Sequence, residues 1–323
     1  MSTHYNLKPV SRLKPGSVIA LIATSSPVQQ KEQLQAAKSW LSARGFAPRI
    51  MPSAQAKMQS PFGYLAGSPQ MRTADLHNAF QDADVGAIWC LRGGFGAHGL
   101  LNKIDYSLLA THAKPFIGYS DVTAIHLAIQ RFSGFITFHG PTLIPDLINN
   151  EFLETEKNVF DLLQVRLSNT DKITAPAGTH LVTLSKGTAN GKLVGGNLAI
   201  IGSLIGTPYE IDTQNAILFL EDIGEAPQRV DRLLAQMQYA GKLSTLKGVL
   251  LGDFSVNDNS YDNQTRINKL YPIFQSYFKP LDIPILASWP SGHCQPNITL
   301  PLGANITLNA DQGYLQIKQT LVV

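Results

Sequence analysis

Short apolar runs alternate with helical patterns through the first half of the chain. Residues 17–23 predict a buried strand, and residues 33–43 after it have the spacing of an amphipathic helix. Further buried strands are predicted at 85–91, 115–119 and 136–139, with a helix at 121–132. Because strands that are apolar almost throughout are typical of a parallel sheet covered on both faces, we predict an α/β domain over residues 1–150.

The second half of the chain has a different pattern. Residues 151–185 are polar and weakly patterned, which predicts a linker with peripheral structure. A second domain is predicted over residues 186–323. Its expected elements are strands at 216–220, 247–251 and 283–287, helices near 198–205 and 229–239, and β alternation over 297–323.

Composition narrows the function classes. The 323 residues suit one large or two medium domains, and a hydrophobic fraction of 44% supports a sizeable core. The formal charge of +3 comes from scattered Lys and Arg, so we expect no nucleic-acid partner.

There is no run of about 18 apolar residues and no apolar leader, so we expect neither a membrane span nor a signal peptide. Cys90 and Cys294 are too few for a disulfide framework, which also favours a cytoplasmic protein.

The strongest local signal for chemistry is residues 116–123, where a predicted strand leads into Ser120 and a helix begins at once. The first N–H groups of such a helix, and the positive end of its dipole, lie at the carboxyl end of the sheet. Ser120 could therefore attack a carbonyl group, with the N–H of Asp121 binding the oxyanion. The usual G-x-S-x-G pattern is incomplete, because Val122 stands where its second glycine would be, and serines that merely cap helices are common.

A glycine-rich loop, RGGFG at residues 92–96, follows another predicted strand at the same edge of the sheet. Glycines allow backbone conformations that turn N–H groups toward a ligand, so Gly93 or Gly94 could provide a second oxyanion donor. The alternatives are a plain turn and a nucleotide-phosphate loop. The sequence has neither a Walker motif nor a complete G-x-G-x-x-G, so we expect no nucleotide cofactor.

A nucleophilic serine needs a base, and histidine is the usual one. Of the eight histidines, His139 ends a predicted strand and His293 lies in a glycine-containing loop after another, so both are candidates. The residues alone do not choose between them. Glu221 directly follows an apolar strand, and we expect it to be partly buried and paired, as an acid that orients the base would be. No set of His, Cys, Asp and Glu has the spacing of a zinc site, so we expect no metal.

Taken in order, these segments resemble the LD-carboxypeptidase family of serine peptidases. The matching motifs run nearly end to end: TSSP at 24–27, LRGGFG at 91–96, GYSDVT at 118–123, TFHGP at 137–141, GKLVGGN at 191–197, LFLEDIGE at 218–225 and GH at 292–293. Each motif is modest alone, whereas their order and spacing together are specific. Phe95 is a small departure, because many relatives have tyrosine there, and a backbone role tolerates either.

The resemblance implies a triad in which Ser120 is the nucleophile, His293 the base and Glu221 the orienting acid. It also implies a flavodoxin-like N-terminal domain, similar to class I glutamine amidotransferases, and a smaller, mixed, β-rich C-terminal domain. Since the serine would come from the first domain and the other two residues from the second, the implied site lies at their interface.

The implied reaction is the release of terminal D-Ala from the cytosolic murein tetrapeptide L-Ala-γ-D-Glu-meso-diaminopimelate-D-Ala, by a homodimer, in cell-wall recycling. Such a substrate carries several carboxylates. Candidates for binding them are Arg92, Lys192, Arg229 and Arg232.

Two other functions remain open at this stage. A related microcin-immunity-type hydrolase would cleave a peptidyl-nucleotide amide with the same triad. It would need an aromatic side chain in the linker region to stack on the nucleobase, and Phe152 and Phe160 lie there. A more distant alternative is a catalytically inactive relative that binds peptides.

Overall fold

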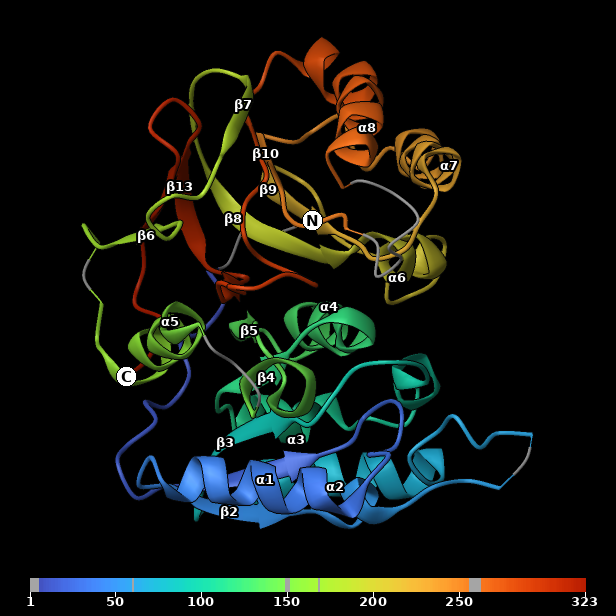
Figure 1. Ribbon diagram of the computed structural model, residues 1–323, viewed down its shortest axis with the longest axis vertical. Coiled ribbons are helices and arrows are strands. Elements are labelled where there is room, and N and C mark those ends of the chain that lie inside the picture. Colours follow the sequence, from blue (N-terminus) through green and yellow to red (C-terminus); the bar gives the residue numbers. More distant parts are fainter. Residues whose placement is uncertain (1–5, 60, 149–151, 168, 256–262) are drawn as a thin grey trace. The chain divides into compact units, whose positions relative to one another are not determined.

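The computed structural model describes residues 6–59, 61–148, 152–167, 169–255 and 263–323. These residues divide into two compact units, each with its own sheet (Figure 1). The N-terminal unit comprises the described residues of Leu7–Arg166, Thr299–Pro301 and Leu321–Val323. The C-terminal unit comprises those of Leu167–Ile298 and Leu302–Thr320, together with Asn6. Among the described helices, none has the length and apolar character needed to cross a bilayer.

The N-terminal unit alternates strands and helices as the apolar pattern predicts. Its strands are β1 (Val18–Ile22), β2 (Ala47–Ile50), β3 (Val85–Cys90), β4 (Phe116–Gly118), β5 (Thr137–His139) and β12 (Leu300–Leu302). Its helices are α1 (Lys31–Ser42), α2 (Pro69–Gln81), α3 (Tyr106–Thr111), α4 (Thr123–Phe132) and α5 (Leu153–Gln164). The six strands form one sheet in the order β12-β5-β4-β3-β1-β2, in which β1 to β5 pair in parallel. The predicted α/β architecture is thus confirmed for this unit.

Helices cover both faces of this sheet. Trp89 of β3 and Phe116 of β4 point to opposite faces, because Phe116 pairs with the residue that precedes Trp89. The Trp89 ring contacts aromatic rings of α1 and α5, whereas the Phe116 ring contacts rings of α2 and α4. The sheet is therefore covered on both faces, as its apolar strands predict.

Helix α5 occupies part of the segment 151–185, for which the sequence predicts a linker. Its Phe160 stacks on Trp40 and Phe46, with ring centroids 6.1 Å and 5.4 Å apart. The structure therefore differs from the predicted boundary at residue 150, because this helix belongs to the core of the N-terminal unit, which extends to Arg166. Val159, Leu162 and Leu163 are buried on one side of α5 at helical spacing, so the segment carries an amphipathic pattern that the sequence analysis missed.

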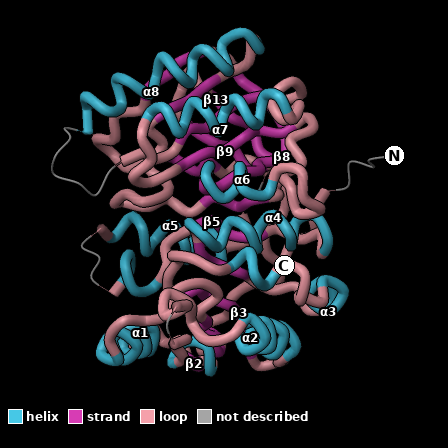
Figure 2. Tube along the Cα trace, turned by 90° about the vertical axis from the view of Figure 1, so that its right-hand side faces the viewer, coloured by secondary structure: helices cyan, strands magenta, loops and turns pink. Residues whose placement is uncertain are grey.

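The C-terminal unit has a mixed sheet. Its strands are β6 (Lys172–Thr174), β7 (Val182–Ser185), β8 (Thr188–Asn197), β9 (Ala216–Glu221), β10 (Gly248–Leu251), β11 (Ile285–Ala287), β13 (Asn305–Asn309) and β14 (Tyr314–Ile317). Its helices are α6 (Leu198–Leu204), α7 (Pro227–Tyr239) and α8 (Asn263–Phe278). The strand order is β6-β14-β13-β8-β9-β10-β11-β7, in which β8 to β11 are parallel and the outer strands antiparallel. Figure 2 shows the three helices over one face of this sheet. Because the sheet has eight strands in both directions, the unit is mixed and β-rich, as expected.

Candidate active site

Ser120 lies at a sharp turn between β4 and α4. Its φ is 64°, in the left-handed region that residues other than glycine rarely adopt. A short 3₁₀ turn, Ser120–Val122, leads directly into α4, and the serine is half-buried. A strained strand-to-helix turn is the conformation that presents a nucleophile at the edge of an α/β sheet. The arrangement of strand, serine and helix predicted from the sequence is present.

The residues beneath this turn explain two features of its sequence. A Cβ at Gly118 would lie 3.0 Å from Cys90 Cβ and 3.1 Å from Val122 Cγ1, so a larger residue would push the turn away from β3. His126 Nε2 lies 2.8 Å from the Gly118 carbonyl oxygen. Burial lowers the pKa of His126 to about 4, so its neutral ring donates this hydrogen bond at neutral pH. His126 therefore supports the turn from within the core.

The glycine-rich loop after β3 passes directly beside the serine. A Cβ at Gly93 would lie 2.9 Å from Ser120 Cβ and 3.1 Å from its Oγ. The φ of Gly94 is 114°, and a Cβ there would lie 2.2 Å from Ser26 Oγ. The same Ser26 oxygen accepts a hydrogen bond from the Phe95 N–H at 3.1 Å. Gly93 and Gly94, the alternatives for the second oxyanion donor, thus belong to tightly packed backbone, Gly93 against Ser120 and Gly94 against Ser26.

The side chain of Asp121 has a role that the sequence analysis missed, since it named this residue only for its backbone N–H. The buried carboxylate accepts a hydrogen bond from the Ala97 N–H at 2.8 Å, which fastens the loop after β3 to the serine turn. Burial raises the pKa of Asp121, while the Ser25 hydroxyl, the Ala97 N–H and the charges of His98 and Arg72 act in the opposite direction. An acidic residue directly after a nucleophilic serine is the sequence signal that could have pointed to this contact.

Glu221 and His293 form a pair within the C-terminal unit. His293 Nδ1 lies 2.7 Å from Glu221 Oε2, and the carboxylate, at the end of β9, has no exposed surface. A Cβ at Gly292 would lie 2.7 Å from the same carboxylate oxygen, which explains the glycine before the histidine. The Gly292 N–H donates to Asn297 Oδ1 at 3.2 Å, which holds the loop. An Nδ1–H bonded to a carboxylate leaves Nε2 as the basic nitrogen of the neutral ring.

Asp222 follows Glu221 and is also buried. Its carboxylate accepts hydrogen bonds from Asn197 Nδ2 at 3.0 Å, from the Ala199 N–H at 2.9 Å and from the Ile223 N–H at 2.8 Å. These contacts join the end of β9 to the start of α6. Burial, and after it the neighbouring charge of Glu221, raises the pKa of Asp222 to about 6. The sequence placed Asp222 at the strand end without assigning it a partner.

The two histidine candidates lie in different surroundings. His139 ends β5 inside the N-terminal unit, where it is fully buried and its ring lies 5.8 Å from that of Tyr119. His293 is the one of the two that pairs with Glu221. Among the residues that the structure describes, no three His, Cys, Asp or Glu side chains are grouped so as to hold a metal ion.

The candidates for binding carboxylates are spread over both units. Arg229 of α7 forms an ion pair with Glu225, which precedes that helix, and Arg232 is exposed on α7. Lys192 is half-buried on β8. Arg92 is half-buried in the loop beside Ser120, with Nη1 3.4 Å from the Pro27 carbonyl oxygen. Arg92 is thus the candidate that shares a loop with Gly93.

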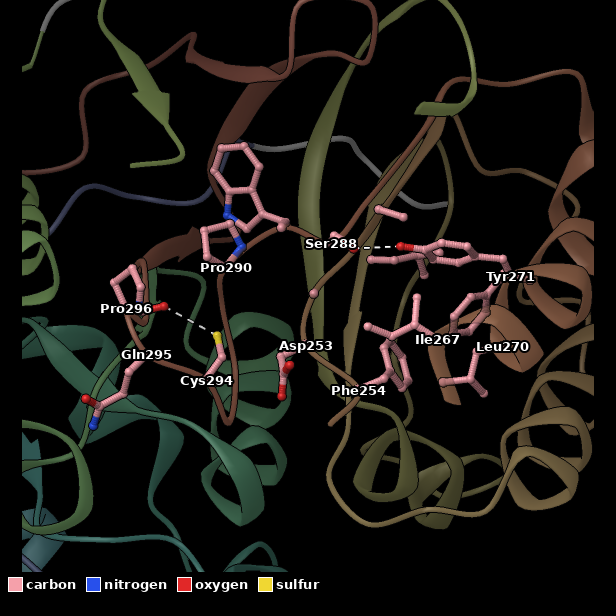
Figure 3. A pocket seen from close by; sticks show the side chains of 15 residues that line it. Asp253, Phe254, Ile267, Leu270, Tyr271, Ser288, Pro290, Cys294, Gln295 and Pro296 are labelled. Atoms are coloured by element: carbon pink, nitrogen blue, oxygen red, sulfur yellow. Dashed lines mark hydrogen bonds between the residues drawn. The ribbon is translucent and has the colours of Figure 1, made fainter. Parts of the chain in front are cut away.

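A cavity of about 210 Å³ lies beside the His293 loop (Figure 3). One wall is formed by Cys294, Gln295 and Pro296, which directly follow the histidine, and much of the rest is aromatic or aliphatic. Tyr271 of α8 bonds through its hydroxyl to Ser288 Oγ at 2.6 Å on the opposite side. The lining includes neither member of the Glu221–His293 pair.

Comparison with known proteins identifies relatives among the carboxypeptidases. Two family models match the chain, the LD-carboxypeptidase N-terminal domain over residues 19–140 and the LD-carboxypeptidase C-terminal domain over residues 190–308. The probable murein peptide carboxypeptidase of Bacillus subtilis is 36% identical over 94% of this chain and 92% of its own length. The murein tetrapeptide carboxypeptidase of Pseudomonas aeruginosa is 29% identical over 91% and 94%, respectively.

Solved structures show the same fold. The muramoyltetrapeptide carboxypeptidase of Oxalobacter formigenes matches with a TM-score of 0.76 and 29% identity, over 93% of this chain and 98% of its own. MccF in complex with glutamyl sulfamoyl guanosine matches with a TM-score of 0.86 over 98% and 99%, at 22% identity, which is a likeness of fold. The architecture and these relatives define a peptidase built from two α/β units. Because the two family models together match most of its length, the chain belongs to the LD-carboxypeptidase family, which confirms the resemblance found in the sequence.

Proposed function

We propose that this protein is a cytoplasmic serine carboxypeptidase that releases the terminal D-Ala of murein tetrapeptide during cell-wall recycling. The observation that carries the proposal is the buried Glu221–His293 pair, in a chain that also holds Ser120 at a strained strand-to-helix turn. The names of two relatives, murein peptide carboxypeptidase and murein tetrapeptide carboxypeptidase, support the choice of substrate.

In the proposed reaction, the Ser120 hydroxyl attacks the carbonyl carbon of the peptide bond before D-Ala. Nε2 of His293 takes the hydroxyl proton, and Glu221 holds Nδ1–H and stabilises the imidazolium. The meeting of the serine of one unit with the imidazole of the other is part of the proposal. His293 then gives the proton to the leaving amine of D-Ala, and water, activated by the same imidazole, hydrolyses the acyl-enzyme.

The proposed oxyanion donors are the backbone N–H groups of Asp121 and of Gly93 or Gly94. Each such donor contributes about 3–4 kcal/mol to the stability of the transition state. Their proposed role is supported by the packing of Gly93 against Ser120 and by the hydrogen bond that joins Asp121 to the loop after β3. Arg92 is proposed to bind a substrate carboxylate, because it lies next to Gly93 in that loop.

The proposal includes a flavodoxin-like N-terminal domain, which the strand order β2-β1-β3-β4-β5 of its parallel part supports. It also includes a homodimer, which rests on the family resemblance. Sedimentation equilibrium of the purified protein tests the dimer.

Substitution of the nucleophile tests the proposed reaction. Ser120→Ala is expected to keep its circular dichroism spectrum and to lose at least about 10⁴-fold in kcat, because the oxyanion donors and the binding surface remain while the attacking group is gone. D-Ala released from the tetrapeptide is measured by mass spectrometry. The exposed Ser107 of α3 offers a matched control, since Ser107→Ala should be fully active. Near-native activity of Ser120→Ala would refute the assignment.

A second candidate function is hydrolysis of a peptidyl-nucleotide amide, which the fold similarity to MccF favours. Of the two aromatic residues expected to stack on a nucleobase, Phe160 is engaged by Trp40 and Phe46, and Phe152 is 41% exposed. The engagement of Phe160 ranks this candidate below the murein peptidase. Side-by-side assays of the tetrapeptide and an aminoacyl-sulfamoyl nucleoside decide between them.

A further inference from the structure

Arg72 is a buried arginine close to the proposed nucleophile site. It lies in the first turn of α2 with 1% of its surface exposed. Its Nη1 donates to the carbonyl oxygen of Thr24 at 2.6 Å and to that of Gly96 at 2.9 Å. Thr24 lies in the loop after β1, and Gly96 ends the glycine-rich loop after β3. One guanidinium nitrogen therefore joins two loops at the carboxyl edge of the sheet.

The glycine-rich loop is shaped to receive this guanidinium. The φ of Gly96 is 115°, and a Cβ there would lie 2.4 Å from Leu65 Cδ2 and 2.9 Å from Arg72 Nη1. A side chain at this position would displace Leu65, the arginine or the loop. The third glycine of the RGGFG segment is therefore explained by its contacts with Leu65 and Arg72, whereas the first, Gly93, is explained by its contact with Ser120.

Asp121 holds the same loop from its other side. Its carboxylate accepts the N–H of Ala97, the residue after Gly96, and Asp121 itself follows Ser120. Arg72 and Asp121 interact electrostatically, and each partly offsets the cost of burying the other's charge. The loop after β3 is thus held by Arg72 on one side and by Asp121, the residue after Ser120, on the other.

Packing alone does not account for an arginine at this position. Burying a guanidinium removes it from water at a considerable cost in free energy, and an apolar side chain of similar volume would fill the space without that cost. What an apolar residue could not do is donate to two carbonyl groups at once. The contacts with Thr24 and Gly96 are therefore the reason we assign to the charge.

We propose that Arg72 is a positioning residue for catalysis, which fixes the backbone of the Gly93–Gly94 segment against Ser120 by binding the carbonyl oxygens of Thr24 and Gly96. This inference rests on the proposed function, since it assigns Arg72 a part in the reaction of Ser120. Arg72 acts through the loop, so its loss should affect the transition state, for which the loop geometry matters most, more than the bound substrate.

The test compares Arg72→Met, which is similar in length and uncharged, with Arg72→Lys and with the wild type. A displacement of about 1 Å in catalytic backbone lowers kcat about 100-fold, so Arg72→Met should lose about that much with KM changed less than about threefold. The kcat of Arg72→Lys should lie between those of the wild type and Arg72→Met, at about a tenfold loss. An ammonium group on a shorter side chain matches the two carbonyls less well. Arg12→Met, at an exposed position of the same unit, should retain full kcat.

The outcomes separate the positioning role from the proposed function. A wild-type enzyme that releases no D-Ala from the tetrapeptide contradicts the proposed function. If the wild type is active and the kcat of Arg72→Met stays within about twofold of it, the positioning role alone is contradicted. A rise in the KM of Arg72→Met with its kcat unchanged contradicts that role as well. Thermal unfolding is measured for each variant. If Arg72→Met is unfolded at the assay temperature, the same twofold criterion applies to Arg72→Lys, which keeps the buried charge.

Discussion

His293 Nδ1 lies 2.7 Å from Oε2 of Glu221, and the carboxylate it contacts has no exposed surface. The two residues are 72 positions apart in the sequence. Water does not compete for a carboxylate buried in this way, so the imidazole that reaches it is held in one orientation and one tautomer. The geometry suits an imidazole whose other nitrogen exchanges a proton with a hydroxyl group.

Removing the charge of Glu221 should abolish most of the activity without unfolding the protein. Glu221→Gln keeps the side-chain shape, but the amide neither stabilises an imidazolium nor selects the Nδ1–H tautomer. We expect kcat to fall about 10⁴-fold with little change in KM. Steady-state kinetics of D-Ala release provide the measurement. The exposed Glu32 of α1 serves as the matched control, and equal activity of Glu221→Gln and Glu32→Gln would exclude Glu221 from the reaction.

A single methyl group in the loop after β3 should also reduce activity. Gly93→Ala would place its Cβ 2.9 Å from Ser120 Cβ, so either the loop or the serine must shift. We expect a loss in kcat of about 100-fold. Gly99 lies six residues along the chain, and a Cβ there meets no atom within 4 Å. Gly99→Ala should therefore be fully active, and an equally active Gly93→Ala would show that the loop does not contribute to the reaction.

Asp222 should make the stability of the protein depend on pH. Because burial, with the charge of Glu221, raises its pKa from 3.8 to about 6, the folded state binds a proton more tightly than the unfolded chain does. Ionisation of Asp222 therefore lowers the free energy of unfolding as the pH rises from about 4 to about 6. Asp222→Asn has no such ionisation, so its stability relative to the wild type should improve between pH 4 and pH 7.

Urea unfolding at pH 4.5 and at pH 7 measures this difference. The exposed Asp212 provides a control, since Asp212→Asn should differ from the wild type by about the same amount at both pH values. In a Glu221→Gln background the neighbouring charge is gone, so the Asp222 effect should become smaller and move to lower pH. A difference between Asp222→Asn and the wild type that does not vary with pH would contradict the assignment.

Much of the fold could be predicted because its signals are local. An apolar run such as 85–91 predicts a buried strand whatever lies beside it, and the step from strand to helix at Ser120 can be read from a few adjacent residues. The prediction of a linker at 151–185 failed, because part of this segment is helix α5. Helix α5 buries Val159, Leu162 and Leu163 on one side, and only the tertiary structure shows that its half-buried Phe160 stacks on Trp40 and Phe46. Its assignment to the N-terminal unit depends on those contacts.

The sequence by itself determined that this is a two-part α/β protein, that Ser120 lies at a strand-to-helix turn, and that Glu221 ends a buried strand. It also determined the family, through the order of its motifs. The residues alone left His139 and His293 open, the family resemblance implied His293, and the structure shows His293 against Glu221. Only the tertiary structure decided that Arg72 and Asp121 hold the loop after β3. The physical reason is that periodicity and turn residues act over a few positions, whereas a hydrogen bond between distant residues depends on the order in which strands pair.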